Sequence, residues 1–222
     1  MKDRTILTLF AVIVLLLIFF LTSFDEQVQN VFGFNKTELK FKTGTAKAAP
    51  KCRLSAVCPK DHFPFKIWSG AANVVGPKIC FNGKNVMSHI LNNVGPGLNI
   101  VVVNDETGVV ERFDYLNMIS GNSADILTYL EKIKPGMIVL VASFDDAATK
   151  MTDEIRQMFV DMGSTLIRSV KHRDNWVFAG RAGIKIKSIF EQRAENDEIT
   201  NVFDGWPEMV QVGGCFPMTK SV

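Results

Sequence analysis

Two short polar clusters carry the side chains best suited to bind a ligand. Asp145 and Asp146 stand together directly after an apolar run, and Arg173 and Asp174 precede Trp176. Adjacent carboxylates can accept hydrogen bonds from sugar hydroxyls or coordinate Ca²⁺. An arginine, a carboxylate and an aromatic ring can together hydrogen-bond and stack on a sugar. Two plainer interpretations stay open: a solvated turn at the first cluster, and at the second an Arg–Asp pair that braces a loop beside a core tryptophan.

Motifs for catalysis are incomplete. The segment 172–175 reads His-Arg-Asp-Asn, as in a kinase catalytic loop, but the Gly-rich loop, the Val-Ala-Ile-Lys strand and the Asp-Phe-Gly motif are all missing. No Gly-x-Ser-x-Gly nucleophile elbow occurs, and His62, His89 and His172 have no metal-ligand spacing. We therefore predict no enzymatic activity, no cofactor and no metal site.

The chain begins with an apolar leader. Residues 6–21 carry no charge and follow Lys2 and Arg4, so we interpret residues 1–24 as a signal peptide or a signal-anchor. If the leader is cleaved, we expect a secreted protein. If it is not cleaved, residues 6–24 would anchor a luminal domain in a membrane. Residues 25–50 form a predicted stem or linker with a glycosylation sequon at Asn35, and residues 51–222 form a predicted single domain.

Four cysteines follow the leader: Cys52, Cys58, Cys80 and Cys215. An even number in an oxidising lumen predicts two disulfides, and spacing alone leaves all three pairings open.

The formal net charge of +2 is close to neutral. It gives no electrostatic argument for binding nucleic acid or heparin-like polyanions.

Apolar patterning and turn residues supply the elements that must position the two clusters. We predict one helix capped by Asn122 and ending near Ile133, and another from the N-cap Thr152 to Met162. Strands are expected at 63–67, at 79–86 with an interruption at Asn82-Gly83, and at 98–103, 109–113, 137–144, 166–170, 176–180 and 209–212. This order favours an α+β fold with a largely antiparallel component.

Motifs spread over residues 51–216 resemble those of the ILEI/PANDER family of cytokine-like proteins (family with sequence similarity 3). They occur in the family order, at 58–59, 69–80, 92–95, 97–100, 144–150, 173–178, 187–188, 190–192, 205–208 and 214–215. The resemblance implies a secreted, non-enzymatic signalling protein. It also implies two packed, largely antiparallel sheets flanked by short helices, with disulfides Cys52–Cys80 and Cys58–Cys215.

The same domain type resembles the lectin-like stem module of protein O-mannose N-acetylglucosaminyltransferase. That resemblance implies sugar contacts from Asp145 and Arg173, and we extend the hypothetical carbohydrate site to Asp174 and Trp176. Ala179 stands where some family members have a further cysteine, so we expect a monomer or a non-covalent oligomer. Ala147-Ala148 replaces a Gly-containing pair in the adjoining loop.

Two functional hypotheses follow from these resemblances. The first is a secreted cytokine- or hormone-like ligand that binds a receptor or a cell-surface glycan. The alternative is a Golgi-anchored type II membrane lectin that binds glycans in the secretory pathway.

Overall fold

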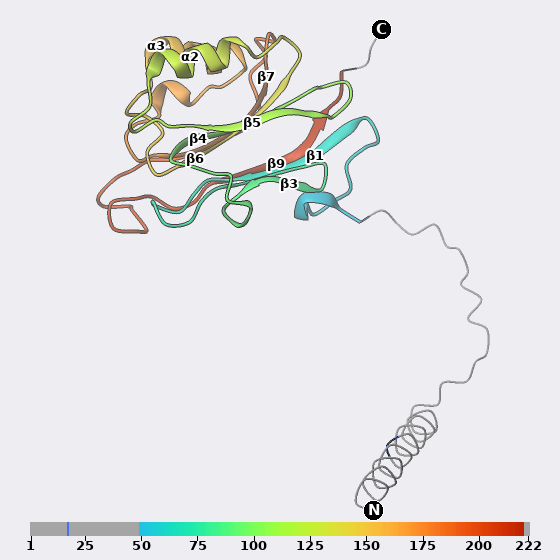
Figure 1. The fold of residues 1–222 in the computed structure, drawn as a ribbon, viewed down its shortest axis with the longest axis horizontal. Coiled ribbons are helices and arrows are strands. Elements are labelled where there is room, and N and C mark those ends of the chain that lie inside the picture. Colours follow the sequence, from blue (N-terminus) through green and yellow to red (C-terminus); the bar gives the residue numbers. More distant parts are fainter. Residues whose placement is uncertain (1–16, 18–48, 220–222) are drawn as a thin grey trace, which may run out of the picture. The chain divides into compact units, whose positions relative to one another are not determined.

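Two apolar strands, β4 (Gly97–Val103) and β6 (Ile138–Phe144), are buried along almost their whole length. Successive side chains of a strand point to opposite faces, so such strands need a covering layer on each side. The computed structural model, which describes Leu17 and residues 49–219, has this arrangement. A five-stranded sheet lies between a four-stranded sheet and a layer of helices (Figure 1).

The five-stranded sheet has the order β5-β4-β6-β7-β8, and every neighbouring pair is antiparallel. Its other strands are β5 (Val110–Leu116), β7 (Asn175–Arg181) and β8 (Phe190–Ala194). One face packs Trp176 and Phe178 against α2 (Ser123–Glu131), α3 (Asp153–Asp161) and the 3₁₀ turn η3 (Ile167–Ser169). The opposite face packs Val101, Leu140 and Val177 against the second sheet.

The four-stranded sheet has the order β3-β2-β1-β9. It comprises β1 (His62–Trp68), β2 (Lys78–Phe81), β3 (Lys84–Ser88) and β9 (Gln211–Pro217). Phe63, Phe65 and Ile67 alternate along β1 and point into the core between the sheets. The first strand of the domain pairs with the last strand along its full length, so the two ends of the domain meet in one sheet.

Both predicted helix N-caps are confirmed. The Asn122 side chain accepts a hydrogen bond from the Ala124 N–H at 2.8 Å, and Thr152 accepts one from the Ile155 N–H at 3.3 Å. These oxygens satisfy amide groups that have no partner within the helix. The α+β fold of two packed antiparallel sheets flanked by short helices is confirmed as well.

Two strand predictions need correction, and one strand was not predicted. The segment 166–170 is η3 and its flanking turn, because Ile167 and Val170, three residues apart, both face the core. The Arg156 guanidinium stabilises that turn, because it donates to the carbonyl oxygens of Ile167 and Val170. The strand expected at 209–212 begins later and runs to Pro217, and β8, with its mixed polar sequence, was not predicted.

The four cysteines form Cys52–Cys80 and Cys58–Cys215, which is the pairing that the family resemblance implies. The first bond fixes the 3₁₀ turn η1 (Lys51–Arg53) to β2, and the second joins the start of the domain to β9.

The predicted leader, the stem and the Asn35 sequon lie outside the described residues. Within Leu17 and residues 49–219, no helix is both long enough and apolar enough to cross a membrane.

Candidate functional site

The two polar clusters meet at one edge of the five-stranded sheet. β6 and β7 are antiparallel neighbours, with Ala142 opposite Val177, so the end of β6 lies beside the start of β7. Asp145 follows β6 with φ 58°, and Arg173 precedes β7 with φ 60°. Both backbones are in the left-handed region, which residues with a Cβ atom seldom adopt. The surrounding contacts must therefore hold these two turns.

Asp146 supplies much of that support. Its Oδ1 accepts from the N–H groups of Ala148 at 2.9 Å and Arg173 at 3.3 Å. Its Oδ2 accepts from the Thr149 N–H at 3.2 Å and from the Thr149 hydroxyl. The buried Asp146 carboxylate thus joins the turn after β6 to the turn before β7.

These contacts also shift the pKa of Asp146. Burial of the carboxylate raises that pKa, but the hydrogen bonds from Thr149, Ala148 and Arg173 outweigh burial. His172, whose Nδ1 lies 3.1 Å from Asp146 Oδ2, adds to the lowering. The pKa of Asp146 is therefore held below its ordinary value, which favours the ionised carboxylate that accepts these hydrogen bonds.

Arg173 presents its side chain over an aromatic ring. The guanidinium carbon lies 4.2 Å from the centroid of the Trp206 ring, within cation–π range. Trp206 closes a tight turn in which it exchanges backbone hydrogen bonds with Phe203. Gly205 in this turn has φ 76°, and a Cβ atom there would be 3.2 Å from an Arg173 guanidinium nitrogen. A glycine therefore permits both the turn and the close approach of Arg173.

The Asp174 carboxylate points into the protein, unlike the side chain of Arg173. Its carboxylate is 1% exposed and accepts from Arg193 Nε at 2.6 Å, from the Lys171 N–H at 2.7 Å and from the Asn196 N–H at 2.8 Å. Both oxygens of the carboxylate accept hydrogen bonds from within the protein. Asp174 therefore braces the loop, but its partner is Arg193 and not Arg173 as in the sequence-based interpretation, and it is not available to a ligand.

Trp176 belongs to the core and offers no ring face to a sugar. It is 0% exposed, stacks on Phe178 with ring centroids 5.5 Å apart, and meets Phe159 edge to face at 5.4 Å. Its indole N–H donates to Glu191 Oε1 at 2.9 Å. The prediction that Trp176 stacks on a ligand is wrong in this structure, because the alternation of β7 points it toward the helices.

The side chains left for contact at this edge are Asp145, His172, Arg173 and Trp206. Among the described residues, neither the Asp145 carboxylate nor the Arg173 guanidinium forms an ion pair or a side-chain hydrogen bond. Trp206 was missed as a site residue because it lies 33 positions from Arg173 in the chain. Its Asp-Gly turn marks a bend, but no local signal gives its spatial partner.

Comparison with known proteins identifies the family. The family model described as "Interleukin-like EMT inducer" matches residues 96–184, which include the whole β6 to β7 edge. Protein FAM3C of Rattus norvegicus and that of Homo sapiens are each 44% identical over 216 residues, covering 95% of this chain and 95% of each relative. Protein FAM3D of Mus musculus is 47% identical over 167 residues, or 75% of both chains. The chain belongs to the FAM3 family.

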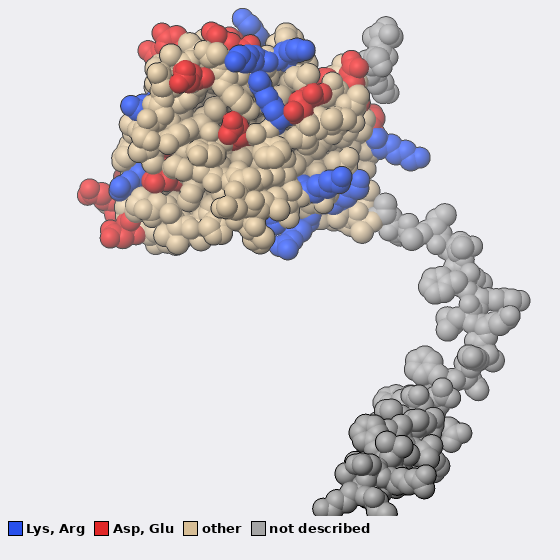
Figure 2. Space-filling view, in the orientation of Figure 1, with Lys and Arg blue, Asp and Glu red and all other residues tan. Residues whose placement is uncertain are grey.

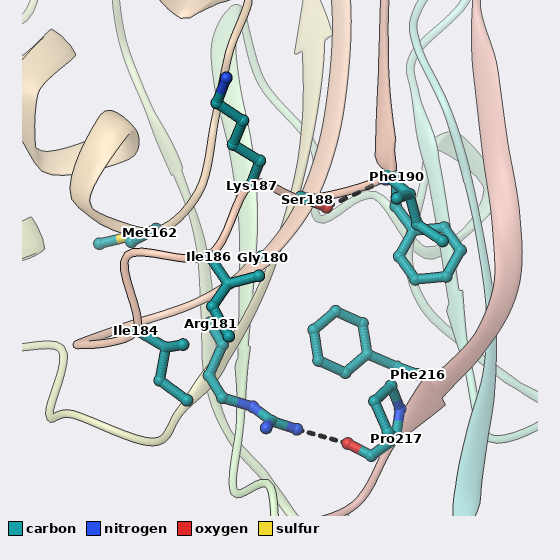
Figure 3. Close-up of a pocket in the computed structure, with 11 residues that line it drawn as sticks. Met162, Gly180, Arg181, Ile184, Ile186, Lys187, Ser188, Phe190, Phe216 and Pro217 are labelled. Atoms are coloured by element: carbon teal, nitrogen blue, oxygen red, sulfur yellow. Dashed lines mark hydrogen bonds between the residues drawn. The ribbon is translucent and has the colours of Figure 1, made fainter.

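In this FAM3 family member, a second candidate site lies at the opposite end of β7. A cavity of about 260 Å³ is lined mainly by apolar side chains from the 182–189 connection, β8 and β9 (Figure 3). Arg181 forms part of the cavity wall, where its guanidinium donates to the Pro217 carbonyl oxygen. Its Nε lies 3.5 Å from Asp105 Oδ2. Because the Arg181 guanidinium is engaged in this way, Lys187 is the other charged side chain that lines this largely apolar cavity.

Proposed function

We propose that this FAM3 family member is a secreted, non-enzymatic, cytokine-like signalling protein that binds a receptor or a cell-surface glycan. The proposal is supported by the family membership and by two disulfides that suit an oxidising, extracellular setting. One observation supports our choice of the binding surface. Asp145 and Arg173 present a carboxylate and a guanidinium on turns that buried groups hold in place.

Such an edge suits a polar ligand with paired donors and acceptors. The guanidinium offers several hydrogen-bond donors in a fixed plane, and the carboxylate offers acceptors. The cation–π contact with Trp206 holds the Arg173 guanidinium in place, so Arg173 loses less conformational freedom when a ligand binds. Sugar hydroxyls and peptide groups both fit this donor and acceptor set, and Arg173 and Asp145 are the proposed contacts for either.

Binding to cells and to an array of glycans tests the proposal. The folded domain should bind saturably, and Arg173→Gln should weaken binding about tenfold, since losing one charged hydrogen-bonding partner costs roughly 1.5 kcal/mol. Arg168→Gln is the matched control, because Arg168 is exposed on η3 and its guanidinium donates to Gln157 instead of facing Asp145 or Trp206. If neither cells nor glycans bind saturably, or if both variants behave alike, the proposed surface is wrong.

Secretion needs its own test, because the leader determines where the domain acts. N-terminal sequencing of protein collected from culture medium should find a chain that starts after the leader. Intact Met1 in membrane fractions, with no protein in the medium, would instead support the membrane-anchored lectin and reject the secreted signal.

A further inference from the structure

We propose that the outer face of the four-stranded sheet binds a sulfated saccharide through Arg53, Lys66, Trp68 and Lys78. These residues lie on a different surface from the Asp145–Arg173 edge. β1 points Phe63, Phe65 and Ile67 into the core, so Lys66 and Trp68 project from the opposite face. Lys78 lies directly across from Trp68 on β2 and shares that face.

Two ammonium groups gather on one indole ring. Lys66 Nζ lies 5.0 Å and Lys78 Nζ 5.3 Å from the Trp68 ring centroid, so the two charges are within about 10 Å of each other. That separation is near the screening length at physiological salt, and the charges repel. Among residues 49–219, neither lysine nor Arg53 forms an ion pair with a carboxylate. An anionic ligand would relieve this repulsion.

The Cys52–Cys80 disulfide adds the third cation. Cys80 lies across from Lys66 in the sheet, so the bond holds η1 over the same outer face. Cys52 and Arg53 have φ of 53° and 55°, an unfavourable conformation for two successive residues with Cβ atoms. The Gly83 N–H donates to Cys52 Sγ at 3.3 Å and helps to hold this turn. Arg53 is therefore presented by a covalently fixed backbone.

Arg53, Trp68, Lys78 and Asn85 line a hollow of about 180 Å³ beside the disulfide. This space suits one anionic group, and the rest of a chain-like ligand could extend over Trp68 toward Lys66. Gly213 leaves room for the Lys66 stem, since a Cβ atom there would lie 2.9 Å from Lys66 Cγ. Figure 2 shows basic side chains along the lower right of the domain, in the region of η1 and β3 in Figure 1.

The residue types favour a sulfated saccharide over other polyanions. Arginine and lysine bind sulfate oxygens, and once the two ammonium groups turn from the Trp68 ring to a sulfate, the indole ring can pack against a sugar ring. A membrane surface would be expected to require large apolar side chains around the cations, but Lys66, Lys78 and the half-buried Trp68 dominate this face. The near-neutral charge of the whole chain did not reveal this local cluster, which comes from residues on β1, β2 and η1.

Binding of a heparin-derived octasaccharide to the folded domain tests the proposal. The wild type should bind saturably, with an affinity that falls as salt rises, and a fully desulfated octasaccharide should not bind. Lys66→Gln with Lys78→Gln should weaken binding about tenfold or more. The matched control is Lys132→Gln with Lys134→Gln, which removes the same charge from exposed positions after α2 and should bind as the wild type does.

Other outcomes reject the proposal. Equal loss in both double variants would mean that only total charge matters, and equal binding of the desulfated saccharide would mean that sulfate is not recognised. Binding to vesicles containing phosphatidylserine, without binding to the octasaccharide, would assign the face to a membrane. Inorganic sulfate that binds alone, with no gain for the saccharide, would mean that Trp68 contacts no sugar.

Discussion

Replacing Asp174 by asparagine tests whether this residue is a brace or a ligand contact. The wild-type Oδ2 accepts from both the Lys171 N–H and Arg193 Nε, while Oδ1 accepts from the Asn196 N–H. An asparagine has one oxygen, so an oxygen kept toward Asn196 would turn the amide NH₂ toward two donors. The Arg193 guanidinium, whose side chain is 15% exposed, would lose its closest counter-charge.

The cost follows from these contacts. Breaking a buried ion pair by removing one partner costs about 3–5 kcal/mol. Glu195 stays 3.2 Å from Arg193 and offsets part of this loss. We expect Asp174→Asn to lower the free energy of unfolding by about 3 kcal/mol, which for a domain of this size lowers Tm by about 6–12 °C.

Urea and thermal unfolding with the disulfides intact provide the measurement. Asp145→Asn is the matched control, since it makes the same chemical change on a carboxylate without a described partner, and it should alter stability by less than about 0.5 kcal/mol. The argument fails if Asp174→Asn is as stable as the wild type. It fails equally if Asp145→Asn loses as much stability.

Two further predictions concern pH and the disulfides. The folded-state pKa of Asp146 is lowered, so its contribution to stability is fully present above the ordinary pKa of an aspartate and is lost as pH falls through the folded-state pKa. The stability difference between wild type and Asp146→Asn should therefore shrink below about pH 4 in urea titrations; a constant difference would refute the assignment. Cys58→Ser with Cys215→Ser should destabilise by about 2–5 kcal/mol. It should cost about 1.5 kcal/mol more than Cys52→Ser with Cys80→Ser, because 157 positions separate its cysteines and 28 separate the others; chemical unfolding of both double variants provides the comparison.

Local patterns predicted the elements that frame the site. The long apolar runs of β4 and β6 and the N-caps Asn122 and Thr152 have clear local signals, because burial and capping are set by neighbouring residues. The Asp145 and Arg173 turns could be predicted as candidate contacts from their residue types. Their meeting at one edge depends on the antiparallel pairing of β6 with β7, which a local pattern does not specify.

Other features depend on tertiary contacts. Asp145 and Asp146 look alike in sequence, yet the left-handed backbone at Asp145 turns the second carboxylate inward, where it holds Ala148, Thr149 and Arg173. Trp206 reaches Arg173 only after the chain has returned from β8. The same limitation hid the cluster of Lys66 and Lys78, since total charge does not report which side chains share a face.

The pairing of β1 with β9 affects how the protein is made. The five-stranded sheet lies within residues 97–194 and can form while the chain is still emerging, but β1 has no partner on its β9 side until the last strand is synthesised. During that interval Cys58 has no correct partner, while Cys52 and Cys80 are already present. A wrong bond with either would have to be exchanged before Cys215 can be joined. We expect disulfide exchange at Cys58 to be the slow step in maturation, faster when an isomerase is present.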